Sequence, residues 1–180
     1  EAISEWLSGY CEGVTTLRSE GRSFPIDIQY RAPKTRSEWL LHLPSVIVEA
    51  LGNADKGVLV FLPGTYEIER VQQALGSLVA TDVGVYTLHS RLSLKEQQHA
   101  LKASDGKRII LATNIAETSL TIEGIDVVVD SGRERRANFL PGYGMNQLAT
   151  HFVSKASATQ RAGRAGRLQP GTCYRVWSKA

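Results

Sequence analysis

The chain has 180 residues, about the length of one domain, and 42% of them are hydrophobic and 22% charged. This composition excludes a disordered protein, and no apolar run approaches the ~18 residues that cross a bilayer, so no membrane partner is predicted. The net charge of +3 is compatible with a polyanionic partner without pointing to one. Cys11 and Cys173 are far apart in the sequence, which excludes a disulfide scaffold or a zinc knuckle.

The first residues are acidic, with glutamates at positions 1, 5 and 12, whereas a secretory signal would start with basic residues. We therefore interpret the chain as a fragment of a larger cytoplasmic protein. Residues 1–20 are expected to be a linker or the tail of a preceding domain. The compact domain is predicted to occupy residues 21–180.

The first half of this domain alternates short strands with amphipathic helices. Alternating apolar residues predict a strand over residues 24–30, and Pro44, a good residue for a first helical turn, is expected to start a helix that ends at Leu51. An apolar strand over residues 58–62 precedes Thr65, the expected N-cap of the next helix.

The same alternation continues with three further apolar strands, predicted over residues 83–88, 108–112 and 125–129. Ser93 and Glu96 have the spacing of a capping box and predict a helix, and Asn114 and Glu117 repeat the pattern for a shorter one. Strands that alternate with amphipathic helices predict an α/β fold with a parallel sheet covered on both faces.

The alternation breaks at residues 133–153, which are predicted to form a β-hairpin with its turn at P-G-Y-G. Ser157 and Gln160 have capping-box spacing and predict a helix to about Gly166, before a last strand over residues 172–177. In open α/β sheets, ligands bind at the carboxyl ends of the strands. This rule directs attention to residues 63–65, 88–91 and 113–121 and to the last helix.

The segment Gln160–Arg167, Q-R-A-G-R-A-G-R, is the strongest candidate for chemistry. Two glycines at a helix edge cost about 1 kcal/mol each relative to alanine, which calls for a reason such as the close approach of a ligand. Arg164 and Arg167 would lie about 60° apart on a helix and could reach one anion. Guanidinium groups suit phosphate oxygens and act on transferring phosphoryl groups. A solvated basic helix end is the alternative.

A second candidate is the polar segment A-T-N-I-A-E-T-S-L-T-I-E-G-I. Thr113 and Asn114 lie where the N–H groups of a starting helix can bind phosphate. Ser119, Thr121 and Glu123 alternate, so they would point to one side of an extended stretch. Helix capping by the same residue types is the alternative.

A third candidate is the predicted hairpin, made basic by Arg133, Arg135 and Arg136. A protruding basic hairpin can hold or split a nucleic-acid strand, and a solvated run of charge is the alternative. The four histidines have no metal-ligand spacing, so no metal site is predicted.

The sequence contains no Walker A loop, because neither glycine pair of the required spacing is followed by Lys and Ser or Thr. A G-x-G-x-x-G fingerprint and a D-E-A-H-like box are missing too. The chain therefore has arginines suited to a phosphoryl group but no obvious means of holding the β-phosphate and Mg²⁺.

Together, these segments resemble the second RecA-like domain of a DEAH-box helicase, over residues 21–177. The resemblance rests on four motifs of that family: F-L-P-G at 61–64 (motif IV), 113–125 (motif V), 127–132 (motif Va) and 160–167 (motif VI). Residues 21–25 and 124–135 are similar to the bacterial HrpB-type enzymes. The resemblance implies a RecA-like (P-loop NTPase-like) three-layer sandwich with a mostly parallel sheet and an inserted hairpin.

The resemblance also implies a role for each residue that matches a motif. The residues that would face the γ-phosphate and the attacking water as catalytic groups are Gln160, Arg164 and Arg167. Those that would lie at the nucleotide are Ser119, Thr121, Glu123 and Leu101. Those that would contact RNA are Gly64, Ser90, Thr113, Asn114 and, in a strand-separating hairpin, Arg133, Arg135 and Arg136. Arg161 would be structural.

At two nucleotide positions the chain departs from the family pattern. Glu123 stands where the family usually has Asp, which would alter the contact to the ribose. Leu101 stands where the family often has the Phe that stacks on adenine, which would weaken base discrimination.

The resemblance thus predicts the C-terminal motor domain of an ATP-dependent RNA helicase, a monomer that acts on RNA or possibly DNA. ATP with Mg²⁺ would bind against the first RecA-like domain of the same chain, which would supply the metal ligands, so these residues alone would be inactive. One alternative is a non-catalytic helicase-like module that binds nucleic acid. A free-standing nucleotide-binding Rossmann enzyme is disfavoured by the missing glycine fingerprint.

Overall fold

The computed structural model describes residues 24–102, 106–118, 120, 122–140, 142 and 144–179, together with residues 6, 9 and 10. The predicted domain start at Gly21 lies outside the described residues, as do Ser119 and Thr121.

Six parallel strands form the central sheet, in the order β1–β8–β5–β2–β4–β3. Their bounds are β1 Ile26–Tyr30, β2 Gly57–Phe61, β3 Gly84–Leu88, β4 Arg108–Ala112, β5 Val127–Asp130 and β8 Gly171–Arg175. All six were expected from the sequence, with ends that differ by at most a couple of residues. The predicted α/β architecture with a parallel sheet is confirmed.

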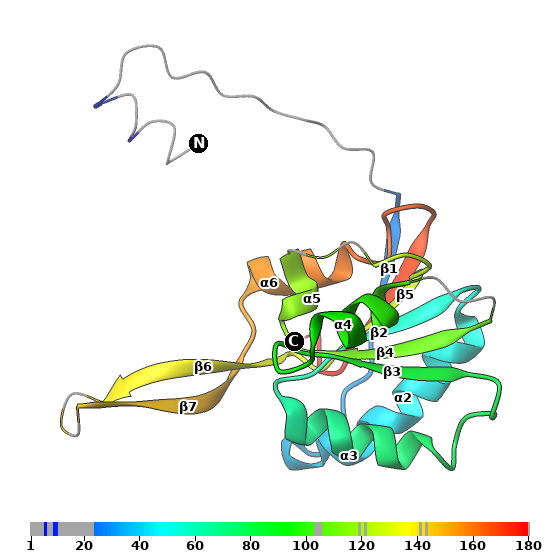
Figure 1. The fold of residues 1–180 in the computed structure, drawn as a ribbon, viewed down its shortest axis with the longest axis horizontal. Coiled ribbons are helices and arrows are strands. Elements are labelled where there is room, and N and C mark those ends of the chain that lie inside the picture. The colour runs from blue at the N-terminus through cyan, green and yellow to red at the C-terminus, as the bar shows by residue number, and fades with distance from the viewer. Residues whose placement is uncertain are drawn as a thin grey trace.

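Helices cover both faces of the sheet (Figure 1). On one face lie α2 (Trp39–Asn53) and α3 (Thr65–Leu75); on the other lie α4 (Leu94–Leu101), α5 (Ile115–Thr118) and α6 (Lys155–Ala162). A short 3₁₀ turn, η1 (Arg36–Glu38), precedes α2.

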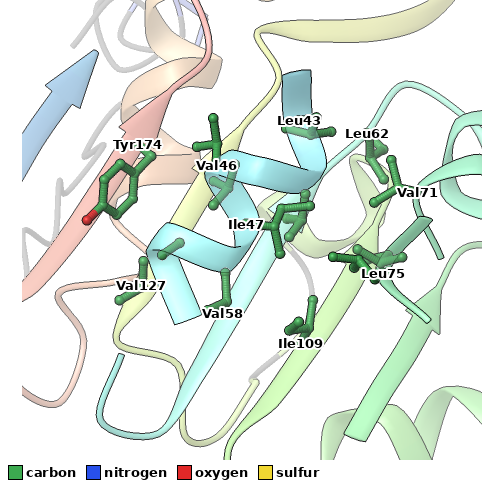
Figure 2. Close-up of a cluster of buried hydrophobic side chains, with 14 of the residues drawn as sticks. Leu43, Val46, Ile47, Val58, Leu62, Val71, Leu75, Ile109, Val127 and Tyr174 are labelled. Carbon is green, nitrogen blue, oxygen red and sulfur yellow. The ribbon is translucent and has the colours of Figure 1, made fainter. Parts of the chain in front are cut away.

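The two hydrophobic cores follow from the side-chain alternation of the strands. In β2, Val58 and Val60 point toward α2 and α3, whereas Leu59 and Phe61 point toward the helices of the other face. Figure 2 shows the first core, in which Ile47 of α2 packs above the sheet. A strand buried on both faces must be apolar at every position, which is why the sequence predicts β2 so clearly.

Two helix starts differ from the prediction. α2 begins at Trp39, so Pro44 lies inside the helix and not in its first turn. The reason is burial: Leu40 and Leu43, which precede the proline, pack in the same core, and this offsets the backbone hydrogen bond that Pro44 cannot donate. In α3 the N-cap is Gly64, and Thr65 is the first helical residue.

The predicted capping box of α4 is confirmed, because the Ser93 hydroxyl accepts from the N–H of Glu96 and the Glu96 carboxylate accepts from the N–H of Ser93. The predicted cap of α6 is wrong. Its N-cap is Ser154, whose Oγ lies 3.1 Å from the N of Ser157. α6 also ends at Ala162, short of the predicted Gly166.

The predicted hairpin is confirmed as an antiparallel pair, β6 (Arg133–Leu140) and β7 (Met145–Phe152), that projects away from the body of the domain (Figure 1). It leaves the sheet after Gly132, whose φ of +70° is a backbone conformation that favours glycine. Among the described residues, no helix has the length and apolar character needed to span a bilayer.

Candidate nucleotide and nucleic-acid site

The predicted RNA-contact residues that follow β2, β3 and β4 lie at the carboxyl ends of these strands, which we call the carboxyl edge. β2, β4 and β3 are parallel neighbours whose last residues pair in register, so the segments that follow them emerge side by side. Ser90 and Asn114 are exposed there, Thr113 is half-buried, and the N–H of Thr113 donates to the carbonyl of Leu88 at 3.1 Å. The structure therefore brings together, at the carboxyl edge, residues that come from three separate segments.

Gly64 belongs to the same edge, but a hairpin residue covers it. The guanidinium carbon of Arg135 lies 3.0 Å from the point that a Cβ on Gly64 would occupy. Arg135 is held there by Glu67 in the first turn of α3, with its Nη2 3.3 Å from Oε1. Gly64 thus permits a close approach of the hairpin to α3, which ties the root of the hairpin to the carboxyl edge.

The three hairpin arginines have different environments. Arg136 is exposed and forms an ion pair with Glu134. The prediction that Arg133 belongs to an exposed basic run is wrong: it is buried, donates to the carbonyls of Ser131 and Arg36, and lies over the rings of Trp39 at 4.3 Å and Phe152 at 5.2 Å. It is the first residue of β6 and directly follows the buried residues Ser131 and Gly132.

Burial lowers the pKa of Arg133 to about 10, and the like charge of Arg36 adds to this effect. Arg133 is still protonated at neutral pH. It therefore contributes a fixed positive charge beneath the root of the hairpin.

Arg161 is the centre of a buried ionic cluster. It is fully buried and pairs through Nη1 with Asp130 at 3.0 Å and through Nε with Glu117 at 3.1 Å, while Glu134 lies 3.8 Å from its Nη2. Burial raises the pKa of Asp130, and the charge of Arg161 opposes this rise. The cluster joins α5, α6, the end of β5 and the start of β6, so Arg161 is structural, as the sequence predicts.

Glu117 is a residue that the sequence analysis assigned only to capping. Its Oε1 accepts from the hydroxyl of Ser157 at 2.6 Å and its Oε2 from Arg161, so its carboxylate turns to α6 and not to its own first turn. The spacing of Asn114 and Glu117 resembles a capping box, and only the fold shows that α6 lies within reach.

Arg164 is buried just beyond the end of α6. Its Nε donates to the carbonyl of Glu117 at 3.2 Å and its Nη1 to the carbonyl of Leu120, while its Nη2 has no hydrogen-bond partner among the described residues. Burial lowers its pKa, as does the charge of Arg167, and Glu117 opposes both effects.

The predicted geometry of the arginine pair is therefore wrong in one respect. Because α6 ends at Ala162, Arg164 and Arg167 do not lie on one helix, and they differ in burial: Arg164 is 3% exposed, whereas Arg167 is exposed, as is Gln160 in the last turn of α6.

A second residue that sequence reasoning missed is Arg108, which is 2% exposed at the amino end of β4. Its guanidinium donates to the carbonyls of Ala100 at 3.0 Å and Leu101 at 3.4 Å, and also to that of Glu123. Burial lowers its pKa. Arg108 therefore links the two predicted nucleotide residues that the structure describes, Leu101 and Glu123, at the amino ends of the strands.

The predicted nucleotide residues and the predicted RNA residues thus lie at opposite ends of the strands. Leu101 and Glu123 lie near the amino ends. The segment after Arg164 reaches the same end, since the carbonyl of Gly166 accepts from the N–H of Phe24, before β1. Ser90 and Asn114 lie at the carboxyl edge. No group of three or more metal-ligating side chains occurs among the described residues.

A protein-family model and the similar proteins and structures described below all match this chain to helicases or their domains. The family model for the helicase conserved C-terminal domain matches residues 41–169. The ATP-dependent RNA helicase HrpB of Escherichia coli is 47% identical over an alignment of 163 residues, and the match covers 89% of this chain and 20% of that protein. The ATP-dependent RNA helicase HrpA of E. coli is 33% identical over an alignment of 180 residues, and the match covers 97% of this chain and 14% of that protein.

Two crystal structures of E. coli HrpB, described as a DExH-box NTPase and a DEAH/RHA helicase, match with TM-scores of 0.82 and 0.83 at 45% identity. Each match covers 89% of this chain, and it covers 20% and 21% of the respective HrpB chains. The chain thus spans about a fifth of the HrpB protein, and its sheet with an inserted hairpin is a RecA-like α/β fold. The chain belongs to the helicase conserved C-terminal domain family, as a DEAH-box domain of the HrpB type.

Proposed function

We propose that this chain is the C-terminal motor domain of an ATP-dependent RNA helicase. In the proposal, it supplies Arg164, Arg167 and Gln160 to ATP bound in a cleft against the first RecA-like domain, and it holds the RNA backbone at its carboxyl edge. The names of the HrpB and HrpA relatives support the ATP and RNA assignments.

The observation that carries the proposal is the Nη2 of Arg164, which has no hydrogen-bond partner among the residues that the structure describes. A buried guanidinium N–H without an acceptor is costly, and the neighbouring charge of Arg167 increases the cost of keeping Arg164 protonated. A phosphate oxygen would supply the acceptor and would relieve the repulsion between the two cations. These residues therefore fit an anionic nucleotide.

ATP is the substrate, and its hydrolysis supplies the free energy of the motor. Arg164 and Arg167 would neutralise the charge that develops on the transferring phosphoryl group, and Gln160 would orient the attacking water. Glu123 would lie beside the ribose and Leu101 beside the base, with Ser119 and Thr121 nearby. We place the Mg²⁺ ligands on the partner domain, so the 180 residues alone are proposed to be inactive.

For RNA, the proposal uses residues of the carboxyl edge and the exposed hairpin: Ser90, Thr113, Asn114, Arg135 and Arg136. Gly64 would contribute by letting Arg135 approach that edge. Hydroxyl, amide and guanidinium groups of this kind bind phosphates, which carry no sequence information. We therefore expect weak sequence preference and a strong dependence of RNA affinity on salt.

Arg167→Ala is the cleanest test. Arg167 is exposed, whereas Arg164 also holds the backbone of Glu117 and Leu120, so its removal would disturb the fold. In the intact protein, we expect Arg167→Ala to lower kcat for RNA-stimulated ATP hydrolysis by about 10³-fold with little change in RNA affinity. Phosphate release and RNA anisotropy measure the two quantities.

The control is Arg70→Ala, which removes an exposed arginine from α3. It should leave both quantities unchanged. An Arg167→Ala enzyme with the kcat of the wild type would overturn the catalytic role, and RNA binding without any hydrolysis by the wild type would favour a non-catalytic binding module.

A further inference from the structure

A cavity of about 840 Å³ lies at the root of the hairpin, on the side of β8 and β1. It is lined by the ends of both strands, by Gly132 and Phe152 at the two ends of the hairpin, and by the start of α6. We call it the hairpin-root pocket. The residues of the proposed RNA site do not line it: Gly64, Ser90, Thr113, Asn114, Arg135 and Arg136. Its volume is in the range of small-ligand sites.

The pocket concentrates positive charge. Its cationic side chains are Lys34, Arg36, Arg133, Lys155, Arg175 and Lys179, and none of the described residues that line it is Asp or Glu. None of the six forms an ion pair with a described carboxylate. The charge of Asp130 acts on Arg175, but Asp130 is fully buried and already paired with Arg161. Six positive side chains around one cavity favour an anionic ligand.

Aromatic rings interleave with these cations. Phe152 is 59% exposed, and its ring centroid lies 5.7 Å from the guanidinium carbon of Arg36 and 5.2 Å from that of Arg133. Trp177 and Tyr30 flank Arg175 at 5.5 and 5.8 Å, and the hydroxyl of Tyr30 accepts from Arg175 at 3.1 Å. Cations that track phosphates and aromatic rings on which bases stack are the two components of single-strand binding sites.

The position of the pocket continues the carboxyl edge. In the order β1–β8–β5–β2–β4–β3, the hairpin follows β5, with the proposed RNA contacts beyond β2 on one side and the pocket at β8 and β1 on the other. We propose that the hairpin-root pocket binds a second segment of single-stranded nucleic acid, on the side of the hairpin opposite to Ser90 and Asn114. This inference rests on the proposed RNA-binding function and adds a separate site to it.

The same charge could attract an acidic polypeptide. The observations favour nucleic acid because the pocket shares an edge with the proposed phosphate contacts and offers an exposed ring as well as cations. An acidic peptide requires the charges but makes no use of a stacking surface.

The test removes only exposed cations of the pocket, in the variant Lys34→Gln/Arg36→Gln/Lys155→Gln of the intact protein. The control Lys56→Gln/Arg70→Gln/Lys95→Gln removes the same charge from exposed positions outside the pocket. The probe is a fluorescein-labelled oligouridylate of about 12 nucleotides that contains 4-thiouridine. Anisotropy across a salt series measures affinity, and photo-crosslinked peptides are identified by mass spectrometry.

We expect the pocket variant to bind the oligouridylate about tenfold or more weakly, with a salt slope smaller by about 2, because each phosphate contact to a single strand contributes about 0.7. The control should stay within about threefold. Crosslinks should include the peptides of Phe152 or Trp177 and should be lost in the pocket variant.

Equal losses in both variants, or crosslinks that map only to the segment around Asn114, would overturn the second site while leaving the proposed function intact. Tighter binding of an oligoglutamate of equal charge would overturn it in favour of a protein ligand. Failure of the wild-type protein to bind the probe at all would refute the inference, whereas a normal effect of Arg167→Ala on hydrolysis would still support the motor assignment.

Discussion

Gly132 shows how one residue can decide where a large element leaves the fold. Its φ of +70° lies in the left-handed region, and a Cβ at this position would meet Cε3 of Trp177 at 2.6 Å. Both the backbone and the packing therefore require glycine. Gly132 is the last residue before the hairpin and lines the hairpin-root pocket, so its conformation determines the direction in which β6 departs.

We expect Gly132→Ala to lower the free energy of unfolding by about 2 kcal/mol or more, because it adds left-handed strain and a clash with an aromatic ring. Urea denaturation measures the change. The control is Gly52→Ala in α2, where a Cβ would meet nothing within 4 Å, so replacement there should be neutral or stabilising by up to about 1 kcal/mol. Equal stability of the two variants would contradict the close packing of Gly132 against Trp177.

At the scale of elements, α5, α6 and the hairpin are joined by two buried arginines. Arg161 bridges Glu117, Asp130 and Glu134, and Arg164 binds the backbone carbonyls of Glu117 in α5 and of Leu120 after it. The segment that carries Gln160 and Arg167 is therefore fixed against both the α5 segment and the root of the hairpin.

Arg161→Met should lower the free energy of unfolding by about 3–5 kcal/mol at neutral pH, because it leaves the buried Asp130 without its cation. The matched control is Arg31→Met, which breaks the partly exposed pair with Glu49 and should cost no more than about 1 kcal/mol. Chemical denaturation of both variants tests the difference. A loss at Arg161 as small as that at Arg31 would contradict the structural role of the cluster.

At the scale of the whole molecule, global unfolding exposes the centre of the sheet, where Cys173 is fully buried beside Val128. Burial raises the pKa of the Cys173 thiol from the ordinary 9.0 to about 12, with the charge of Asp130 adding to the rise. Between these values the unfolded thiol releases its proton and the folded thiol does not. Rising pH therefore favours unfolding, and the stability present below pH 9 is lost progressively above it.

The contribution of Cys173 to the free energy of unfolding should fall by about 1.4 kcal/mol per pH unit above pH 9. Cys173→Ala removes this dependence, so the difference in stability between this variant and the wild type should shrink as the pH rises. Val128→Ala removes a neighbouring apolar group that cannot ionise and should follow the wild type in parallel. Urea denaturation at pH 7, 9 and 10 distinguishes the two, and parallel curves for all three proteins would contradict the raised pKa.

The strands, the hairpin and the capping box of α4 could be predicted because each depends on residues close in sequence. A fully buried strand is an apolar run, and a capping box is a spacing of three residues. The start of α2 at Trp39 could not be predicted, because burial of Leu43 overrides the proline signal. The end of α6 at Ala162 could not be predicted either, because packing against β1 and β8 shapes the turn that follows it.

The order of the elements, the fold class and the motif segments follow from the amino-acid sequence, because side-chain periodicity and motif spacing are properties of neighbouring residues. The folded chain is needed to know which arginines are buried, which arginine pairs with Glu117, and which line a pocket with no acidic residue among its described walls. The physical reason is that burial and charge pairing depend on segments that meet only when the sheet has formed. Arg133, Arg135 and Arg136 are adjacent or nearly so in sequence, yet they face three different surroundings.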